Sequence, residues 1–213
     1  MTEGQARFDL FETMALDPHE GITHLERHIA RMQASAELLG FRFDRHRLRN
    51  ELQAATFRVT EPSRVRMMLS RGGALAVEVR SSLAWPNAVI PVAVVPRPVP
   101  VDDIRLYHKT TDRSPYDAAR AAGGTFEVLM TDPDGYLTEG SFTSVFLERD
   151  ERLVTPPLSR GLLPGVLRQH LIEIGEAVEG DIRVSDIKGN FFIGNAARGL
   201  VAATLVARRG DHG

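Results

Sequence analysis

Cysteine is absent from the 213-residue chain, and lysine is nearly so. Without cysteine there is no disulfide, no thiolate nucleophile and no cysteine-based metal site. Of 26 basic residues only Lys109 and Lys188 are lysines, so arginine supplies almost all of the fixed positive charge. A lysine kept against that bias is a candidate for chemistry that a guanidinium cannot perform, because an amine can form a Schiff base with a carbonyl. The alternative for Lys109 is chance retention at the start of a helix.

The chain also lacks a long apolar run and a strong net charge. Its longest apolar stretch, near residues 88–95, is far shorter than a membrane span, and the start MTEGQARFD has no apolar signal-peptide core. A formal net charge of −2 gives no electrostatic basis for binding nucleic acid or an anionic membrane. We therefore expect a cytoplasmic protein that binds a small-molecule substrate, with no nucleic-acid or membrane partner.

What the sequence does contain is a succession of strand and helix patterns. We expect a strand at residues 7–16, then a helix that begins after Thr23 and has Glu26 three residues later, as in a capping box. Apolar residues recur along this helix at spacings of three and four, and Gly40 ends it. A second helix and a hairpin turning at Gly72-Gly73 follow.

The domain organisation follows from composition. The segment PRPVPVDD at residues 96–103 is rich in proline and charge, as is typical of a stiff linker between domains. With 43% apolar residues the chain can bury one large core or two small ones. We therefore predict a mixed α/β (α+β) protein with a small domain over residues 1–97 and a larger one over residues 98–213, which carries Lys109.

The stretch from Tyr107 to Phe146 holds the candidate chemistry. Lys109 ends an extended segment just before a predicted helix, where a side chain can reach a cleft. A strand and the turn TDPDG follow, and then comes Leu-Thr-Glu-Gly-Ser, whose carboxylate is Glu139. On position alone Glu139 could equally be a surface turn carboxylate.

The spacing H-K-T-T-x-R-x-x-Y, followed by T-E-G-S-x-x-x-V-F, resembles the fold type IV pyridoxal-phosphate enzymes, or class IV aminotransferase family. That family includes branched-chain and D-amino acid aminotransferases and aminodeoxychorismate lyase. The H-K-T-T form most resembles the lyase and the lyase-like C-terminal domain of fused aminodeoxychorismate synthases, over about Phe8 to Leu205. The resemblance implies a two-domain fold like that of D-amino acid aminotransferase, with pyridoxal 5′-phosphate between the domains.

The resemblance also implies roles for single residues. Lys109 would hold the cofactor as a Schiff base and then act as general base and acid, and Glu139 would keep the pyridine nitrogen protonated. The phosphate would be bound by the arginine of an H-x-x-R-M motif, by backbone N–H groups after L-P-G and by a segment similar to N-S-x-R-G. These residues are Arg31, Val166, Leu167, Asn195 and Ala196.

Two positions depart from the family pattern, because Ala196 replaces a serine and Ser144 stands where asparagine is usual. The implied function is 4-amino-4-deoxychorismate lyase, giving p-aminobenzoate and pyruvate for folate biosynthesis, in a homodimer. The alternatives are an aminotransferase for branched-chain or D-amino acids, and a cofactor-poor pseudoenzyme that supports aminodeoxychorismate synthase as its partner. No metal is expected, since His24 and His28 are four residues apart but have no evident third ligand.

Overall fold

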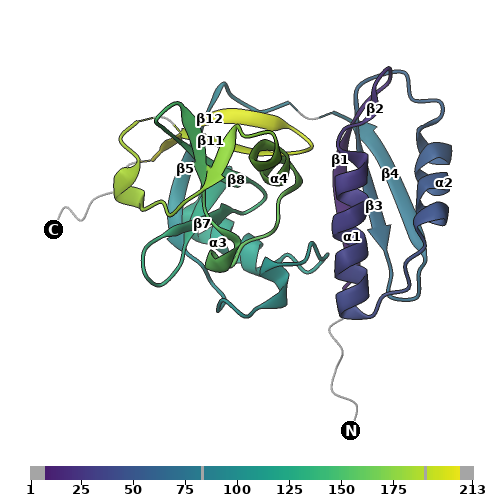
Figure 1. Cartoon of the computed structure of the whole chain (residues 1–213), viewed down its shortest axis with the longest axis horizontal. Coiled ribbons are helices and arrows are strands. Elements are labelled where there is room, and N and C mark those ends of the chain that lie inside the picture. The colour runs from purple at the N-terminus through teal and green to yellow at the C-terminus, as the bar shows by residue number, and fades with distance from the viewer. Residues whose placement is uncertain (1–7, 83, 190, 207–213) are drawn as a thin grey trace, which may run out of the picture. The chain divides into compact units, whose positions relative to one another are not determined.

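The structure, a computed structural model, describes residues 8–82, 84–189 and 191–206. The chain forms two compact units, each with its own sheet and helices (Figure 1). Unit 1 contains residues 8–82 together with His108–Asp112, and unit 2 contains Ala84–Tyr107 and residues 113–206. The segment that carries Lys109 thus belongs to the N-terminal unit, although it lies in the middle of the sequence.

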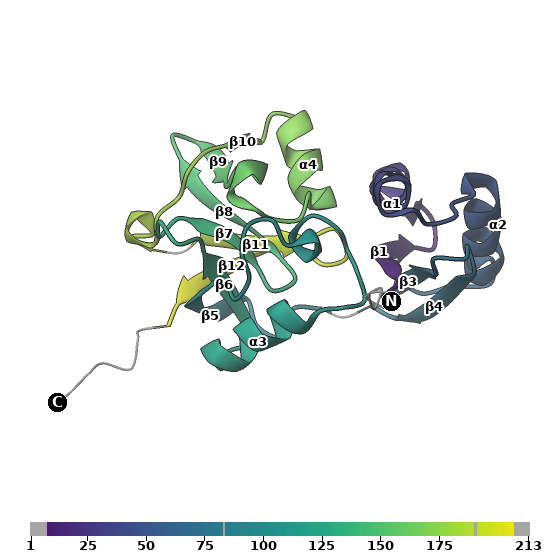
Figure 2. The same cartoon turned by 90° about the horizontal axis from the view of Figure 1, so that it is seen from below.

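Unit 1 is built on a four-stranded antiparallel sheet in the order β2-β1-β3-β4. Two helices lie on one side of it (Figure 2), and alternate residues of β1 and β3 pack beneath them, among them Leu10, Met14, Val65 and Met67. The other face therefore carries the intervening residues. The elements are β1 (Leu10–Asp17), β2 (Gly21–Ile22), α1 (Leu25–Leu39), α2 (Arg45–Thr56), β3 (Ser63–Leu69) and β4 (Leu75–Ser81).

The predicted apolar stripe of α1 is confirmed, and so is its end, because Gly40 adopts φ 70° and its N–H donates to Ala36 O. The predicted capping box is wrong. His24, in a left-handed conformation with φ 53°, is the N-cap residue, and the Glu26 carboxylate instead pairs with Arg45 and Arg49 of α2. Two guanidinium partners on a neighbouring helix outcompete one backbone N–H for the same carboxylate.

Unit 2 is built on an eight-stranded mixed sheet in the order β10-β9-β8-β11-β12-β5-β6-β7. Strand β5 runs parallel to both of its neighbours, and β9 runs parallel to β10. Its strands are β5 (Val89–Pro96), β6 (Glu127–Thr131), β7 (Leu137–Gly140), β8 (Ser144–Arg149), β9 (Arg152–Thr155), β10 (Ala177–Glu179), β11 (Phe191–Asn195) and β12 (Gly199–Leu205). Its α-helices are α3 (Ser114–Gly123) and α4 (Val166–Glu173), and short 3-10 turns occupy Ile104–Leu106, Leu158–Arg160 and Val184–Asp186.

The sheet of unit 2 must curl. In a flat sheet β7 and β8 would lie about 24 Å apart, since five strand spacings separate them in the order above. Only Ser141, Phe142 and Thr143 connect them, and a link of that length spans roughly 15 Å at most. A bond from Gly140 N–H to Thr143 O at 2.7 Å closes the connection tightly. The three-residue loop 141–143 therefore joins the edge strand to the middle of the sheet.

The structure divides the chain differently from the expectation of a boundary after residue 97. Strand β5 is hydrogen-bonded between β12 and β6, which puts it in unit 2. The proline-rich segment after it is no free linker, because the Arg97 guanidinium donates to Arg160 O at 2.6 Å and Gly161 O at 3.2 Å. Proline-rich composition predicts extended backbone, but it does not distinguish a solvated linker from a segment tied to a domain by an arginine.

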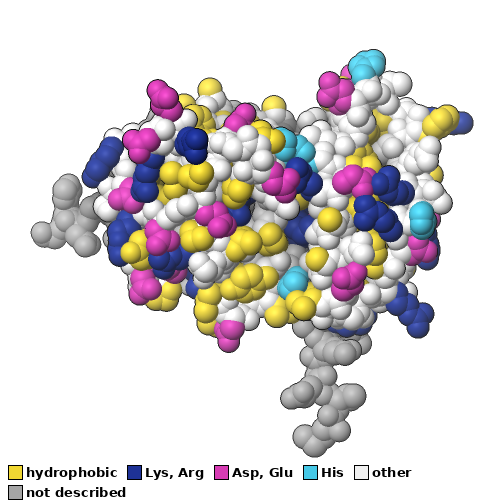
Figure 3. All heavy atoms as spheres, viewed as in Figure 1, with side chains coloured by type: hydrophobic (Ala, Val, Ile, Leu, Met, Phe, Trp, Pro, Cys, Tyr) yellow, Lys and Arg dark blue, Asp and Glu magenta, His cyan; other side chains and the backbone are white. Residues whose placement is uncertain are grey.

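No helix in the part of the chain that the structure describes combines the length and the apolar character needed to cross a membrane. On the face of each unit seen in Figure 3, basic and acidic side chains are interspersed. That distribution accords with the small net charge of the sequence.

Candidate active site

Lys109 is held at the edge of the sheet of unit 1. Phe11 N–H donates to Lys109 O at 3.0 Å, and Leu10 and Thr110 form an antiparallel bridge. The segment His108–Asp112 thus adds a short extended edge beside β1. Backbone pairing, which side-chain changes do not easily disturb, therefore positions the lysine.

The direction of the Lys109 side chain follows from alternation along this extended segment. Thr110 is buried, and the His108 ring bonds Ser35 Oγ on α1 at 2.9 Å, so both neighbours of Lys109 point to the helix side. Lys109 points to the opposite face, where its Nζ lies 4.6 Å from the centre of the Phe11 ring. Burial lowers the pKa of His108, which favours its neutral form.

Arg66 lies over the same aromatic ring. On β3 it pairs in register with Thr13, and its guanidinium carbon is 4.5 Å from the centre of the Phe11 ring. Its Nε is buried and has no hydrogen-bond partner among the described residues. Such an atom in a native fold calls for an explanation, and an absent ligand is one. Two cationic side chains thus meet at Phe11 on the face away from α1 and α2.

Arg31, predicted to bind phosphate, is fixed by a buried carboxylate. Its Nε donates to Glu12 Oε1 at 2.8 Å, and His28 Nδ1 lies 2.7 Å from Glu12 Oε2. Burial would raise the pKa of Glu12, but the Arg31 guanidinium and the bond from His28 lower that pKa to about 2. His28 of α1, four residues after His24, is therefore an internal partner of Glu12, and phosphate binding by Arg31 stays a prediction.

Glu139 lies on β7 in unit 2 and is only 6% exposed, so it is not a surface turn carboxylate. The Tyr116 hydroxyl donates to Glu139 Oε1 at 2.9 Å. Burial and the charge of Glu139 raise the pKa of Tyr116 well above its usual value. The Arg113 guanidinium lies 3.6 Å over the Tyr116 ring and donates to Ser141 O. Tyr116 and Arg113 both belong to the motif around Lys109, where the spacing alone gave them no role.

Helix α4 begins directly after Gly165, so Val166 and Leu167 are its first residues. The first N–H groups of a helix have no acceptor within it and favour an anion. A Cβ at Gly165 would lie 2.6 Å from Ser144 Oγ, so the Ser144 side chain closely approaches the start of the helix. Ser144, which departs from the family pattern, thus lies against the predicted phosphate-binding turn.

Asn195 shapes the turn that follows β11. Its Oδ1 accepts from the N–H groups of Ala197 and Arg198 at 3.0 Å each, and its Nδ2 donates to Phe142 O at 3.2 Å. The next residue, Ala196, packs against a core cluster that includes Leu167. In unit 2 the structure therefore brings Asn195, Ala196 and the start of α4 together around loop 141–143.

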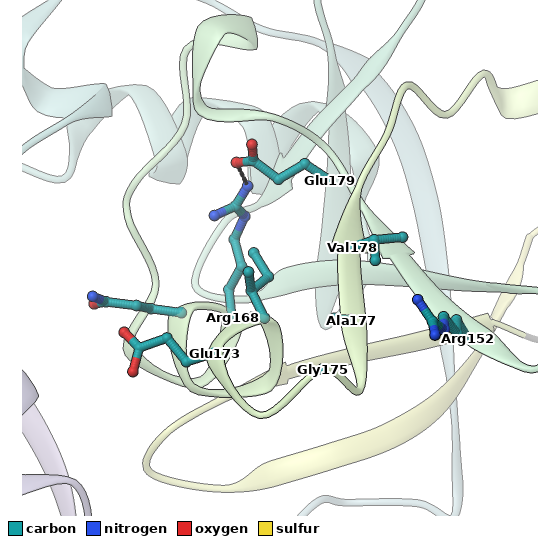
Figure 4. Close-up of a pocket in the computed structure, with 9 residues that line it drawn as sticks. Arg152, Arg168, Glu173, Gly175, Ala177, Val178 and Glu179 are labelled. Atoms are coloured by element: carbon teal, nitrogen blue, oxygen red, sulfur yellow. Dashed lines mark hydrogen bonds and ion pairs between the residues drawn. The ribbon is translucent and has the colours of Figure 1, made fainter.

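A surface hollow of about 520 Å³ lies beside α4 and β10, and none of the predicted site residues lines it (Figure 4). Arg168, the arginine of L-P-G-x-x-R, is buried there, pairs with Glu179 and donates to Pro156 O at 2.7 Å. These bonds tie the helix to its surroundings. We assign the hollow no role in the chemistry.

Sequence reasoning missed Glu12 and Arg66, and a signal in the sequence existed only for Glu12. Glu12 stands between Leu10 and Met14 at an inward position of an alternating strand, which predicts a buried carboxylate. Arg66 stands at an outward position of β3, where arginine is ordinary. Only the three-dimensional contact with Phe11 distinguishes it from a solvated side chain.

The residues present fit pyridoxal phosphate in kind. Lys109 offers an amine for the aldehyde, Glu139 offers a buried acceptor for a protonated ring nitrogen, and the start of α4 offers N–H donors for a phosphate.

The comparisons with known proteins agree with that chemistry. The family model described as amino-transferase class IV matches residues 9–206. A Schizosaccharomyces pombe protein named "Putative aminodeoxychorismate lyase" is 29% identical over 180 residues, which are 81% of this chain and 77% of that protein. The crystal structure of a "Putative amino-acid aminotransferase" from Mesorhizobium loti is 34% identical, with a TM-score of 0.87 over 93% of this chain and 100% of that one.

A structure named "Putative 4-amino-4-deoxychorismate lyase" from Legionella pneumophila shares the fold at 17% identity, with a TM-score of 0.81 over 94% of this chain and 83% of that one. The predicted mixed α/β fold of type IV is thus confirmed. Enzymes of this family depend on pyridoxal phosphate, and the chain belongs to the class IV aminotransferases.

Proposed function

We propose that the protein is a pyridoxal-phosphate-dependent lyase that converts 4-amino-4-deoxychorismate into p-aminobenzoate and pyruvate. The observation that carries the proposal is the pairing of Lys109 Nζ and the Arg66 guanidinium over one Phe11 ring. It puts an amine for covalent chemistry beside a cation suited to a carboxylate. The relative named as an aminodeoxychorismate lyase, which matches most of the chain, supports the same reaction.

The cofactor contacts are part of this proposal. Lys109 binds the aldehyde carbon, Glu139 accepts from the ring nitrogen, and Arg31, the N–H groups of Val166 and Leu167, and the turn at Asn195 and Ala196 hold the phosphate. Lys109 lies in unit 1 and Glu139 in unit 2, and we propose that both serve the same cofactor. Because Ala196 has a methyl where the family pattern has a hydroxyl, one phosphate hydrogen bond of that pattern is missing in this chain.

Bound pyridoxal phosphate supplies an electron sink for charge that forms at the substrate carbon. The Lys109 amine would act as the base that takes the proton from the substrate carbon bearing the amine. In aminodeoxychorismate the electron pair of the broken C–H bond then forms the last ring double bond as the enolpyruvyl ether leaves. Protonation of the methylene carbon of the released enolpyruvate would give pyruvate, and the amine stays on the aromatic product.

Glu139 holds a proton at the ring nitrogen of the cofactor, and Tyr116 fixes the direction of that carboxylate. The hydroxyl bond at 2.9 Å and the low exposure of Glu139 keep water from competing for the same oxygen. A buried, ionised acceptor is the group that makes a protonated pyridine nitrogen stable.

The substrate of the proposed reaction carries two carboxylates, and Arg66 is our candidate for binding one of them. Its planar guanidinium suits bidentate contact with a carboxylate, and its buried Nε has no partner among the described residues. A ligand carboxylate would give that atom the partner that the described part of the chain does not provide.

An aminotransferase acting on branched-chain or D-amino acids is the second candidate. It is favoured by the 34% identical structure named as an amino-acid aminotransferase. A Thermotoga maritima protein named "Probable branched-chain-amino-acid aminotransferase" supports it over a shorter match, 34% identical over 62 residues. Such an enzyme must release a keto acid and leave the amine on the cofactor, so it needs a keto-acid acceptor at every cycle.

We further propose a homodimer in the cytoplasm, with an aminodeoxychorismate synthase component as a candidate partner. These proposals rest on the family resemblance, since composition alone carries no information on assembly. A cofactor-poor pseudoenzyme that supports the synthase remains the third candidate, because Ala196 and Ser144 both depart from the family pattern.

The decisive assay supplies aminodeoxychorismate alone in one tube, and several L- and D-amino acids with 2-oxoglutarate in a second. We expect p-aminobenzoate and pyruvate in equal amounts in the first tube without any acceptor. Lys109→Arg, which keeps the charge but cannot form the Schiff base at a useful rate, is the matched control and should be inactive. Acceptor-dependent transfer without p-aminobenzoate would establish the aminotransferase, and inactivity in both tubes would leave the pseudoenzyme.

A further inference from the structure

Glu127 is a buried carboxylate that the chemistry above does not use. It begins β6, is 0% exposed and forms no ion pair with any described residue. Its Oε1 accepts from Val128 N–H at 2.8 Å, from Ser141 N–H at 2.8 Å and from Ser141 Oγ at 2.6 Å. Its Oε2 accepts from Phe142 N–H at 3.1 Å and from Thr143 Oγ1 at 2.9 Å.

Three of these five donors are backbone N–H groups, which can only donate, so an ionised carboxylate satisfies the set best. Burial raises the pKa of Glu127, and the bonds from Ser141, Val128 and Phe142 oppose that rise. A buried charge is costly without a cation, and several hydrogen bonds must compensate for it here. Most of that compensation comes from one place, since four of the five donors belong to loop 141–143.

The same loop meets every element of unit 2 that we assign to the cofactor. It follows Glu139 and Gly140 directly and leads into Ser144, which lies against Gly165 at the start of α4. Its carbonyl groups are held as well, because Arg113 donates to Ser141 O and Asn195 Nδ2 donates to Phe142 O.

Gly140 shows how tightly the loop is closed. A Cβ at this position would lie 2.2 Å from Thr143 Oγ1 and 3.0 Å from Glu127 Oε2, so it would displace the Thr143 hydroxyl that bonds Glu127. The backbone that carries the Glu139 side chain is thus packed directly against the Glu127 carboxylate.

We propose that Glu127 is a positioning residue: its ionised carboxylate fixes loop 141–143, and through that loop it sets the direction of Glu139 and the spacing between Glu139 and the start of α4. The proposal rests on the proposed cofactor site. Glu127 itself touches neither substrate nor cofactor. It acts on the chemistry through Ser141, Phe142 and Thr143, whose backbone N–H and hydroxyl groups it holds.

Glu127→Gln tests the proposal, because the amide keeps the shape but offers one acceptor oxygen and puts an NH₂ group against donors. We expect the amides of residues 140–143 to exchange with deuterium roughly tenfold faster or more in the cofactor-free variant than in the wild type. Pyridoxal phosphate, titrated by its visible absorption, should bind about tenfold more weakly. Ser141→Ala, which removes one donor, should shift both readouts the same way and serves if Glu127→Gln does not fold.

The matched control is Asp132→Asn in the same unit. Asp132 is also buried and accepts from two backbone N–H groups, those of Asp134 and Tyr136, but it directly follows the other end of β6 and also pairs with Arg160. This variant should unfold at a lower temperature, with wild-type exchange at residues 140–143 and wild-type cofactor affinity.

The proposal is overturned if Glu127→Gln and Ser141→Ala lower the unfolding temperature while loop exchange and cofactor affinity stay at wild-type values. A wild-type protein that takes up no pyridoxal phosphate would contradict the proposed function instead. The exchange measurement on the cofactor-free protein would still decide whether Glu127 holds the loop.

Discussion

At the scale of the residue, buried carboxylates orient the groups that we propose for the cofactor site. Glu12 lies beneath Arg31, Glu127 lies beneath loop 141–143, and Glu139 is itself fixed by Tyr116. Each is almost fully buried, and each is satisfied by directed donors. A fixed acceptor in a low-dielectric environment holds its partner more rigidly than a solvated one does, because water cannot replace it.

Glu12→Gln should cost stability in a pH-dependent manner. The folded state lowers the pKa of Glu12 from 4.5 to about 2, so its stabilising contribution is fully present above pH 4.5 and is lost as the pH falls toward 2. The shift corresponds to roughly 3 kcal/mol at neutral pH. We expect urea denaturation to show a loss of about that size in the free energy of unfolding at pH 7, and less than about half of that loss near pH 3.

Glu26→Gln is the control for that experiment, because Glu26 also pairs with two arginines but is exposed to solvent. Glu26→Gln should lower the free energy of unfolding by less than about 1 kcal/mol at either pH. If Glu12→Gln lowers the free energy of unfolding by the same amount at pH 7 and pH 3, the charge of Glu12 does not stabilise the fold.

At the scale of the element, sequence patterns located most helices and strands, and they failed where a side chain had competing partners. The apolar period of α1 and the glycine at its end were readable because they depend on local geometry alone. The start of α1 was not, since Glu26 is drawn to arginines of the next helix. Strand β7 was not predicted as a strand either, because its four residues, Leu137–Gly140, are all buried and show no alternation of apolar and polar positions.

The approach of α4 to the β11–β12 turn depends on Gly194. A Cβ there would lie 2.7 Å from Gly199 O and 2.9 Å from Leu167 Cδ2, and the backbone oxygen has no room to yield. We expect Gly194→Ala to destabilise the protein by about 1–3 kcal/mol, as overpacking does, and to weaken the binding of pyridoxal phosphate because the start of α4 is displaced.

Gly189→Ala is the matched variant, since no atom of the described residues beyond its chain neighbours lies within 4 Å of the added methyl group. Its unfolding temperature and its affinity for pyridoxal phosphate should be close to those of the wild type. Equal behaviour of the two alanine variants would contradict the packing that we describe around Leu167.

At the scale of the whole molecule, the motifs around Lys109 and Glu139 identified the family, whereas composition misplaced the division of the chain. The boundary expected after residue 97 fails because β5 completes the sheet of unit 2 through long-range pairing. Likewise, Lys109 joins unit 1 through pairing with β1, a contact between segments about a hundred residues apart that no local pattern contains. The motifs identified the family without the correct domain division, because their residues are determined by the chemistry of the site and not by the order of the strands.

The central claim is that Lys109 is the amine that binds pyridoxal phosphate, and reduction of the loaded protein with borohydride tests it most directly. The visible absorption band should disappear on reduction, and peptide mass analysis should find a pyridoxyl group on Lys109. The only other lysine, Lys188, provides an internal control in the same digest. Label on Lys188, or on neither lysine, would contradict the account.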